Sequence, residues 1–342
     1  MRAYVVPSGC RSIDELRRVD RPHPQVRAGQ VLVRIRAASL NRRDQAIIDG
    51  TYFGRPVAHD TIPLSDGAGE VTAVGEGVVR FKPGDRVAAA FFQTPPGGPP
   101  FAARATLGSP LDGALAEQMT AYEDGLVPVP EGLTFEEAAC LPCAAVTAWN
   151  ALMIAGKPVM PGDTVLVLGT GGVSMFALQF ARAAGARVIA TSSSDEKIER
   201  VKALGAAATV NPARTPEWDR EVLKLTDGRG VDCVIEVGGA GTLERSIGSL
   251  AEGGKVGLIG VLTGSGAPIN PYGLMWKRGS VHGILVGDID TFRQMNRAVE
   301  MHDIRPIIDR SFPFDEAIAA YHHQASGNFI GKVVITFDPT GC

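Results

Sequence analysis

The chain has 342 residues, with 34 Lys and Arg against 37 Asp and Glu, so its formal net charge at pH 7 is −3. A chain without a basic excess lacks the electrostatic signature of a protein that binds nucleic acid or an anionic membrane surface. Hydrophobic residues make up 45% and charged residues 21%, the balance of an ordinary soluble protein. The length exceeds that of one ordinary hydrophobic core and predicts two domains.

The first third of the chain is predicted to form a small β-domain. Short alternating stretches at residues 31–35, 69–74 and 85–90 are separated by Gly and Pro, which is typical of a β-barrel-like fold. Residues 94–100 contain four Pro and two Gly and predict a solvent-exposed loop.

The central part of the chain carries a candidate nucleotide-binding turn. The apolar run Thr164–Leu168 breaks into a glycine cluster, and a helical pattern follows over residues 175–184. This order of strand, tight turn and helix suits a dinucleotide pyrophosphate. Gly169 would form the turn, Gly171 would let the backbone approach the phosphate oxygens, and Ser174 replaces the third glycine of the usual pattern with another small residue. The helix N-terminus would then present N–H groups to the anion.

Three further strands are predicted downstream. Residues 187–191 follow the first strand after one helix, as a βαβ unit requires. Residues 231–238 and 254–260 read as buried strands that end in Gly238 and Gly260, where backbone can lie close to a ligand. The alternative is an ordinary α/β domain with glycines at its turns. We predict a doubly wound parallel sheet with a nucleotide at its carboxyl edge.

The end of the second predicted strand indicates which cofactor is bound. NAD enzymes place a carboxylate there to bind the ribose 2′-hydroxyl. Here four hydroxyl residues, 191–194, precede Asp195, and Lys197 and Arg200 follow within a turn. Hydroxyl donors and a cation suit a 2′-phosphate, so we expect NADPH, although serines before a helix are also ordinary N-caps.

The last part of the chain is expected to return to the first domain. A helical stretch runs from residue 287 to about 301, and residues 331–337 read as a terminal strand that has no place in the nucleotide sheet. The predicted domains are residues 1–126, 127–286 and 287–342, the first and last forming one unit.

No apolar run is long enough for a signal peptide or a membrane span. The five cysteines are scattered and odd in number, which favours reduced thiols in the cytoplasm over a disulfide framework. They are Cys10, Cys140, Cys143, Cys233 and Cys342.

Several motifs together resemble the medium-chain dehydrogenase/reductase superfamily. They are Asp66-Gly67-Ala68-Gly69-Glu70-Val71, Pro83-Gly84-Asp85-Arg86-Val87, Asp112-Gly113-Ala114-Leu115-Ala116-Glu117 and Gly331-Lys332-Val333-Val334. The resemblance implies an α/β protein with a GroES-like β-barrel catalytic domain, a central Rossmann domain and an active site in the cleft between them. It also implies a small-molecule substrate and self-association into a homo-oligomer through the last Rossmann strand, here residues 280–286.

Zinc-dependent members of this superfamily hold a catalytic metal with a Cys, a His and a third Cys or Asp. Those positions correspond here to Asn41, Ser65 and Cys143, and only the last is a usual zinc ligand. The four-cysteine structural lobe is also missing, since residues 45–139 contain no cysteine. His59, close in sequence to Ser65, is the alternative ligand, but an isolated loop histidine is more often a surface residue. We expect no zinc.

Asn41, Asp44 and Tyr52 instead resemble the quinone oxidoreductase branch, which works without metal. The resemblance places Asn41 beside the substrate oxygen as a hydrogen-bond donor and makes Tyr52 a candidate proton source, while Asp44 orients its neighbours. Alternatively, Asn41 is a turn residue that bonds local backbone and Tyr52 is a wall of the cleft.

The cofactor-binding residues follow partly from the motif and partly from the resemblance. The resemblance places Thr147 by the nicotinamide, Val261 and Leu262 behind the ring, and Asn328 and Lys332 in a segment that closes on the cofactor. The alternative for Lys332 is an exposed strand residue. The full predicted set adds Gly169, Thr170, Gly171, Gly172, Val173, Thr191, Ser192, Ser193, Lys197, Gly238 and Gly260.

Three functions remain open from the sequence. The first is a zinc-independent NADPH-dependent reductase of quinones or α,β-unsaturated carbonyls, which spread the incoming charge without help from a metal. The second is a zinc-free alcohol dehydrogenase or ketone reductase. The third is a protein that binds NADPH without turnover.

Overall fold

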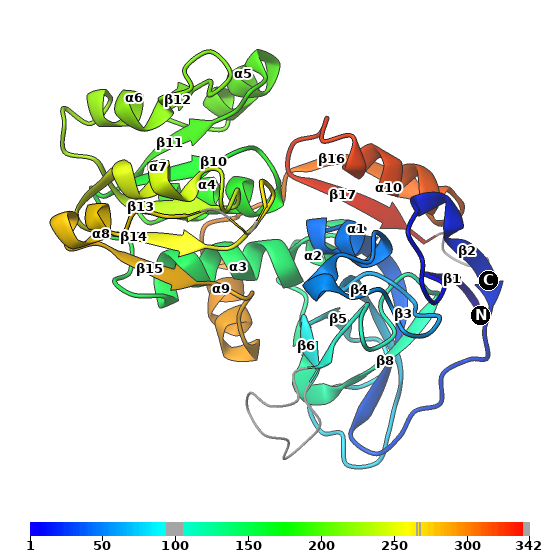
Figure 1. Cartoon of the computed structure of the whole chain (residues 1–342). Coiled ribbons are helices and arrows are strands. Elements are labelled where there is room, and N and C mark those ends of the chain that lie inside the picture. The colour runs from blue at the N-terminus through cyan, green and yellow to red at the C-terminus, as the bar shows by residue number, and fades with distance from the viewer. Residues whose placement is uncertain (94–104, 265, 267, 338–342) are drawn as a thin grey trace. The chain divides into compact units, whose positions relative to one another are not determined.

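A computed structural model describes residues 1–93, 105–264, 266 and 268–337 (Figure 1). The chain divides into two compact units, the first made of Met1–Ala144 with Asp288–Cys342 and the second of Ala145–Gly287. The expected loop at residues 94–100 lies outside the described part of the chain.

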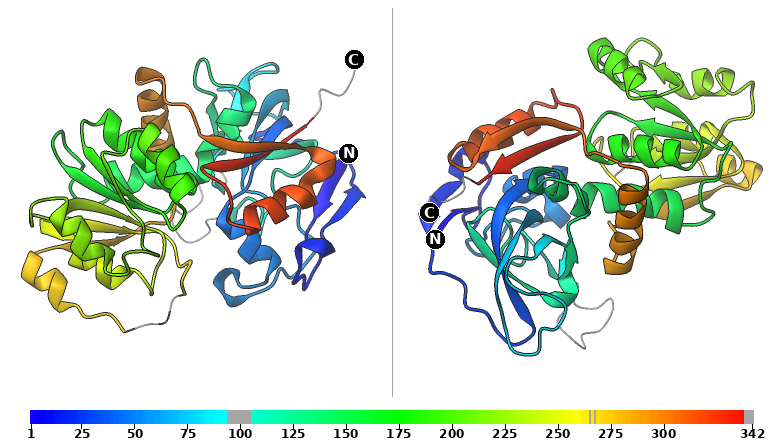
Figure 2. Two further views of the ribbon diagram at one scale, coloured as in Figure 1. Left: turned by 90° about the horizontal axis from the view of Figure 1, so that it is seen from above. Right: turned by 180° about the vertical axis from the view of Figure 1, so that it is seen from behind.

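The first unit is built on a seven-stranded sheet. Six strands follow the order β16-β17-β3-β4-β5-β9, and β8 pairs with β3. These strands are β3 (Gln30–Ser39), β4 (Asp66–Val74), β5 (Arg86–Ala89), β8 (Gln118–Tyr122), β9 (Leu126–Pro128), β16 (Ile308–Pro313) and β17 (Lys332–Thr336). β17 runs antiparallel to β3, with Val334 opposite Ser39. The terminal strand therefore belongs to the first unit, and Figure 2 shows it beside the N-terminal part of the chain.

Alternation along β3 explains how this sheet forms its core. Val31, Val33 and Ile35 are each at most 2% exposed and pack into one apolar cluster. Side chains of alternate residues point to the same face of a strand, so one apolar face is buried by each second residue. The other elements of the unit are β1 (Arg2–Val5), β2 (Arg17–Asp20), β6 (Phe92–Gln93), β7 (Ala105–Thr106), α1 (Arg42–Ile48), α2 (Phe135–Ala139), α9 (Ile289–Met301), α10 (Ala317–Ala325), η1 (Ile13–Glu15), η2 (Tyr52–Gly54), η3 (Glu123–Gly125) and η6 (Phe314–Glu316).

The boundary between the units differs from the one expected at residue 126. The first unit continues to Ala144 because β9 pairs with β5 and α2 packs on β3, β4 and β17. The second boundary, at residues 287 and 288, lies one residue from the expected position. A sequence pattern marks where an element begins, but only pairing shows to which sheet a short strand belongs.

The second unit contains a six-stranded sheet in the order β12-β11-β10-β13-β14-β15. All neighbouring strands are parallel, and helices lie on both faces (Figure 2). The most buried strands read as continuous apolar runs because both faces are covered. The strands are β10 (Thr164–Leu168), β11 (Arg187–Thr191), β12 (Ala208–Val210), β13 (Val231–Glu236), β14 (Leu250–Leu258) and β15 (Ser280–Gly283).

Two helices of the second unit begin at residues that are common at the N-cap position. Gly171 is the N-cap of α4, and Ser194 caps α5 with its side-chain oxygen, which accepts from Lys197 N. β15 ends at Gly283, three residues before the expected end, and Val286 has a φ of 55° that a strand does not adopt. The helical elements are α3 (Val146–Trp149), α4 (Gly172–Ala183), α5 (Asp195–Ala203), α6 (Trp218–Lys224), α7 (Leu243–Gly248), α8 (Tyr272–Lys277), η5 (Asn150–Ile154) and, at the junction of the units, η4 (Leu141–Ala145).

None of the helices among the described residues is long and apolar enough to cross a membrane.

Candidate functional site

The predicted phosphate-binding turn lies between β10 and α4 in the second unit. Gly169 has a φ of 72°, the left-handed region that favours glycine. Gly171 has a φ of −74°, which any residue adopts, and a Cβ built there meets no described atom within 4 Å. Open space in front of a helix N-terminus is what a phosphate group needs for close contact with backbone N–H groups.

One side chain from a strand and one from a helix support this turn. Thr191 Oγ1, at the end of β11, accepts a hydrogen bond of 3.2 Å from Gly169 N. Ser174 Oγ donates to Leu168 O at 2.7 Å and is 1% exposed, so the residue in place of the third glycine ties α4 to β10. Thr191 therefore shapes the turn in addition to being a candidate cofactor contact.

The edge that follows β11 presents hydroxyl groups. Ser192 is buried and Ser193 is exposed, while Ser194 serves as the N-cap of α5. The Asp195 carboxylate accepts from Asn211 Nδ2 at 2.9 Å and forms an ion pair with Arg214. The first carboxylate after the strand is thus already engaged by other side chains.

A buried carboxylate that the sequence analysis missed organises the next strand end. Glu236, the last residue of β13, is fully buried and accepts from Gly238 N at 2.6 Å and Gly239 N at 3.0 Å. Thr242 Oγ1 donates to the same oxygen at 2.7 Å, and Ser246 Oγ donates to the other. Glu236 thereby holds the glycine loop at the carboxyl edge of the sheet. A carboxylate two residues before a Gly-Gly pair was the available signal.

The remaining predicted residues of the second unit differ in exposure. A Cβ on Gly260 would approach Val237 O to 2.3 Å, so this glycine is required by close backbone packing. Val261 and Leu262 are 61% and 55% exposed, which leaves both accessible to a ligand, whereas Thr147 in α3 is 3% exposed. Thr170 is buried, and Gly172, Val173 and Lys197 are half-buried.

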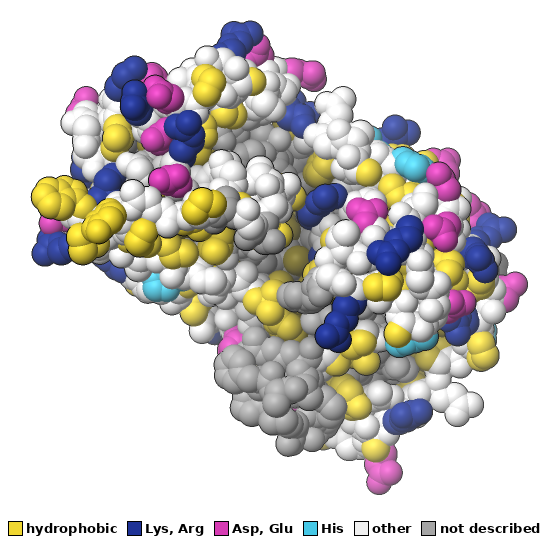
Figure 3. All heavy atoms as spheres, viewed as in Figure 1, with side chains coloured by type: hydrophobic (Ala, Val, Ile, Leu, Met, Phe, Trp, Pro, Cys, Tyr) yellow, Lys and Arg dark blue, Asp and Glu magenta, His cyan; other side chains and the backbone are white. Residues whose placement is uncertain are grey.

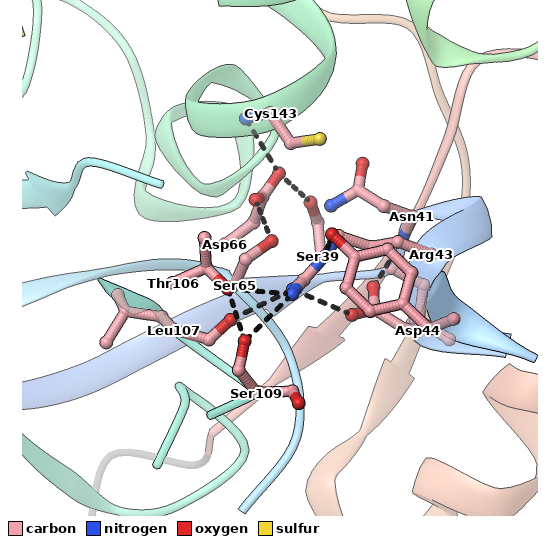
Figure 4. A network of polar contacts seen from close by, with 12 residues as sticks. Ser39, Asn41, Arg43, Asp44, Ser65, Asp66, Thr106, Leu107, Ser109 and Cys143 are labelled. Carbon is pink, nitrogen blue, oxygen red and sulfur yellow. Dashed lines mark hydrogen bonds and ion pairs between the residues drawn. The ribbon is translucent and has the colours of Figure 1, made fainter. Parts of the chain in front are cut away.

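The first unit contains a connected polar network, and Figure 4 shows its contacts around Arg43 and Asp66. Lys332 Nζ, from the first residue of β17, belongs to the same network and donates to Asn41 Oδ1 at 2.6 Å and to Leu40 O at 2.7 Å. Lys332 is 2% exposed, which excludes the alternative of an exposed strand residue. Asn41 is the N-cap of α1 and forms a capping box with Asp44, and its side-chain oxygen also bonds Lys332, a residue distant in sequence.

Asp66 joins further side chains to this network. Its Oδ2 lies 3.7 Å from Lys332 Nζ and accepts from Cys143 N at 3.3 Å. Ser65 Oγ donates to Oδ1 at 2.8 Å, and Ser39 Oγ approaches Oδ2 at 3.4 Å. Asp66 is fully buried, so these donors and the ammonium group offset the cost of removing its charge from water.

Arg43 connects α1 to Tyr52. Its Nε donates to Tyr52 Oη at 3.3 Å, and its guanidinium lies over the rings of Tyr52 and Phe91 at 4.9 and 4.7 Å. Three further acceptors are Leu107 O, Thr106 Oγ1 and Ser109 O. One buried cation thus holds Tyr52 and the segment after β7 together.

Asp44 lies beneath this cluster, fully buried, and accepts from Asn41 N at 2.7 Å. Burial raises the pKa of the Asp44 carboxyl to about 6, with Arg43 and the Asn41 N–H opposing the shift. Burial, aided by the Asp66 charge, also raises the pKa of the Cys143 thiol, so that the neutral form dominates at neutral pH.

The structure therefore brings Asn41, Asp44 and Lys332 together, with Tyr52 linked through Arg43. Asn328 is exposed and lies outside the network. Ser39, Arg43 and Asp66 were not predicted as site residues. Arg43 sits between two predicted residues in the sequence, and this proximity was the only local signal for it.

The described residues contain no group of three or more His, Cys, Asp or Glu side chains that could hold a metal ion.

Comparison with known proteins agrees with this architecture. Residues 27–131 match the family described as alcohol dehydrogenase GroES-like domain, and residues 172–301 match the family described as zinc-binding dehydrogenase. A zinc-type alcohol dehydrogenase-like protein of Schizosaccharomyces pombe is 45% identical over 98% of this chain and 99% of its own length. This chain belongs to the medium-chain dehydrogenase/reductase superfamily.

Two other superfamily members show the range of names among its relatives. Quinone oxidoreductase of Rattus norvegicus is 32% identical, over 92% of this chain and 90% of its own. The crystal structure of an NAD-dependent alcohol dehydrogenase is 33% identical with a TM-score of 0.89, covering 98% of this chain and 99% of that one. This medium-chain dehydrogenase/reductase is accordingly an NAD(P)-dependent oxidoreductase with a GroES-like unit and a Rossmann-type sheet.

Proposed function

We propose that this oxidoreductase works without zinc and uses NADPH to reduce a quinone or an α,β-unsaturated carbonyl. The observation that carries the proposal is the polar network of the first unit. It holds a buried lysine ammonium against Asn41 and leaves the amide donor of Asn41 without a described partner, at a position where zinc-dependent relatives would keep a metal ligand.

The donor set at those positions does not suit zinc. The Asn41 oxygen accepts from Lys332, and the Ser65 hydroxyl donates to Asp66. Zinc binds cysteine as thiolate, whereas burial raises the pKa of the Cys143 thiol. The Lys332 ammonium lies 2.6 Å from the Asn41 side-chain oxygen. A divalent cation bound to the same oxygen would therefore lie close to this positive charge. We therefore derive no step through a metal.

The chemistry follows from which groups remain. Bound NADPH supplies the hydride. Asn41 Nδ2 donates to the substrate oxygen on which negative charge develops, and a donor of this kind contributes roughly 3–4 kcal/mol to transition-state stabilisation. A conjugated acceptor spreads that charge over an enolate or hydroquinone anion, so one amide donor suffices. Tyr52 delivers the proton, directly or through water, and the adjacent Arg43 cation stabilises the charge left on its oxygen.

The preference for NADPH rests on the end of β11. Ser192 and Ser193 are followed by Asp195, whose carboxylate is engaged with Asn211 and Arg214. Hydroxyl groups at that place suit a 2′-phosphate, and a carboxylate would repel it. The structure of a mycobacterial relative complexed with NADPH is 29% identical with a TM-score of 0.83 and covers 98% of this chain and 100% of that one.

The second candidate function is a zinc-free alcohol dehydrogenase or ketone reductase in the same site. The names of the relative from Schizosaccharomyces pombe and of the NAD-dependent structure favour it. A saturated ketone localises charge on one oxygen, so this reaction would demand more from the Asn41 donor than reduction of a conjugated acceptor does.

The deciding experiment combines metal analysis with an acceptor panel. The purified protein is assayed with NADPH and with NADH against a quinone, an enone, a saturated ketone and an aldehyde, before and after treatment with a strong chelator. We expect less than 0.1 zinc per chain as an order-of-magnitude bound, activity that survives chelation, and the highest kcat/KM with NADPH and a conjugated acceptor. Stoichiometric zinc whose removal abolishes activity, or a preference for saturated carbonyls, would overturn the proposal.

We further propose that the protein self-associates through β15. This strand is the last in the sheet order and has only β14 as a described neighbour. An exposed strand edge is a ready template for pairing with a second copy. Figure 3 shows apolar side chains gathered over α8, the helix that precedes β15, where Tyr272, Met275 and Trp276 are 69%, 66% and 85% exposed.

A further inference from the structure

The Asn41 amide has an orientation that its surroundings determine. Its Oδ1 accepts from Lys332 Nζ at 2.6 Å. A lysine ammonium only donates, so the oxygen of the amide must face Lys332 and the NH₂ group must face the opposite way. The side chain of Asn41 is 9% exposed, and among the residues the structure describes no acceptor lies within hydrogen-bond distance of its Nδ2.

An unpartnered buried donor is costly. Leaving such a group without an acceptor costs about 1–3 kcal/mol, and native proteins keep few of them. The cost is recovered when a ligand oxygen fills the position in front of the donor. The Asn41 NH₂ group therefore needs an acceptor that the described chain does not provide.

Lys332 is itself held firmly in place. Its ammonium donates to Leu40 O at 2.7 Å and lies 3.7 Å from Asp66 Oδ2. Asp66 is in turn bound by Ser65 Oγ and Cys143 N. The preceding Gly331 has a φ of 77°, and a Cβ there would approach Ile307 O to 2.1 Å. The backbone conformation that leads into β17 is therefore restricted.

We propose that Lys332 is a positioning residue that turns the Asn41 amide and polarises it, so that Nδ2 is the donor to the reacting oxygen. The proposal rests on the proposed function of Asn41. Positive charge at Oδ1 draws electron density from the amide and strengthens the N–H donors on its other end. The positive charge of Lys332 thus acts on the reacting oxygen through the Asn41 amide, and the lysine itself does not contact the substrate.

This role differs from direct binding of the cofactor by Lys332. Two of the three ammonium hydrogens are engaged by Leu40 O and Asn41 Oδ1, and the Asp66 carboxylate attracts the third. Loss of Lys332 is therefore expected to act on turnover, with little effect on NADPH affinity.

The test is a double-mutant cycle on the full-length enzyme with Lys332→Met, Asn41→Ala and both together. We expect Lys332→Met to lower kcat by about tenfold to a hundredfold, by analogy with residues that orient a catalytic ligand, and to leave the NADPH Kd from fluorescence titration within about twofold. In the Asn41→Ala background the same change is expected to alter kcat less than about twofold. Lys277→Met is the matched control, because that ammonium bonds only the backbone carbonyls of Gly248 and Leu250.

Equal kcat losses in the two backgrounds, or a loss that appears wholly in the NADPH Kd, would overturn the proposal.

A second cycle is independent of turnover and uses the Tm. Asn41→Asp keeps an acceptor oxygen against Lys332, so we expect it to retain the wild-type Tm when Lys332 is present and to lower it in the Lys332→Met background. Equal shifts in both backgrounds would show that the contact is absent. An inactive wild-type enzyme would refute the proposed function, whereas this cycle would still decide the contact.

Discussion

Asp44 illustrates how one buried side chain can make the stability of the fold depend on pH. Its carboxyl is fully buried, yet it is required as the acceptor for Asn41 N at the start of α1. Arg43 lies 3.8 Å away and compensates only part of the cost of burying the charge. Asp44 therefore fixes the backbone of Asn41 at a cost that grows as the carboxyl ionises.

We predict that Asp44→Asn changes the pH dependence of unfolding. The pKa of about 6 in the folded protein lies above the ordinary aspartate pKa of 3.8, so the folded state binds this proton more tightly. The associated stability is fully present below about pH 4 and is lost as the pH rises through 6. Relative to wild type, the variant should gain about 1–2 kcal/mol between pH 5 and pH 8, measured by urea denaturation. A difference that is constant across this range would contradict the prediction.

At the scale of elements, two glycines in the turn between β10 and α4 have different roles, one in folding and the other in ligand binding. Gly169 needs a positive φ, whereas Gly171 has an ordinary φ and open space where a Cβ would project. The first glycine is thus required by the chain itself. The second is required only if a ligand comes close to the backbone.

We predict opposite effects for the two alanine substitutions. Gly171→Ala should retain the wild-type Tm and raise the NADPH Kd at least about tenfold, because its Cβ occupies the space of a phosphate oxygen. Gly169→Ala should lower the free energy of unfolding by about 1–2 kcal/mol through its left-handed backbone. Thermal denaturation and fluorescence titration of both variants provide the measurements. Unchanged NADPH affinity in Gly171→Ala would place the pyrophosphate elsewhere.

At the scale of the whole molecule, the chain forms two units with separate apolar cores. The sheet of the second unit ends at β15, and beyond the strand Leu285 is 54% exposed. A solvent-exposed leucine next to a strand edge that no other described strand pairs with is a candidate for contact with another copy.

We predict that Leu285→Lys weakens self-association without unfolding the protein. A charge at the centre of an apolar contact is costly to bury, whereas an exposed side chain contributes little to the fold. Light scattering coupled to size-exclusion chromatography should show a smaller mass at equal protein concentration. Trp276→Glu tests the contribution of the apolar side chains on α8, and dissociation by that substitution alone would place the interface on the helix and not at β15.

The sequence by itself determined the Rossmann-type sheet and its turn, because strand, glycines and helix lie within about 20 consecutive residues and each signal is local. It also indicated that the terminal strand lies outside this sheet, since that strand has no place in the order of strands and helices predicted there. Only the tertiary structure decided how the catalytic candidates meet. Lys332 reaches Asn41 across 291 residues, and Arg43 reaches Leu107 across 64. A periodic sequence pattern does not predict such contacts, because they form only when β17 pairs with β3 and a buried charged group bonds an acceptor close to it.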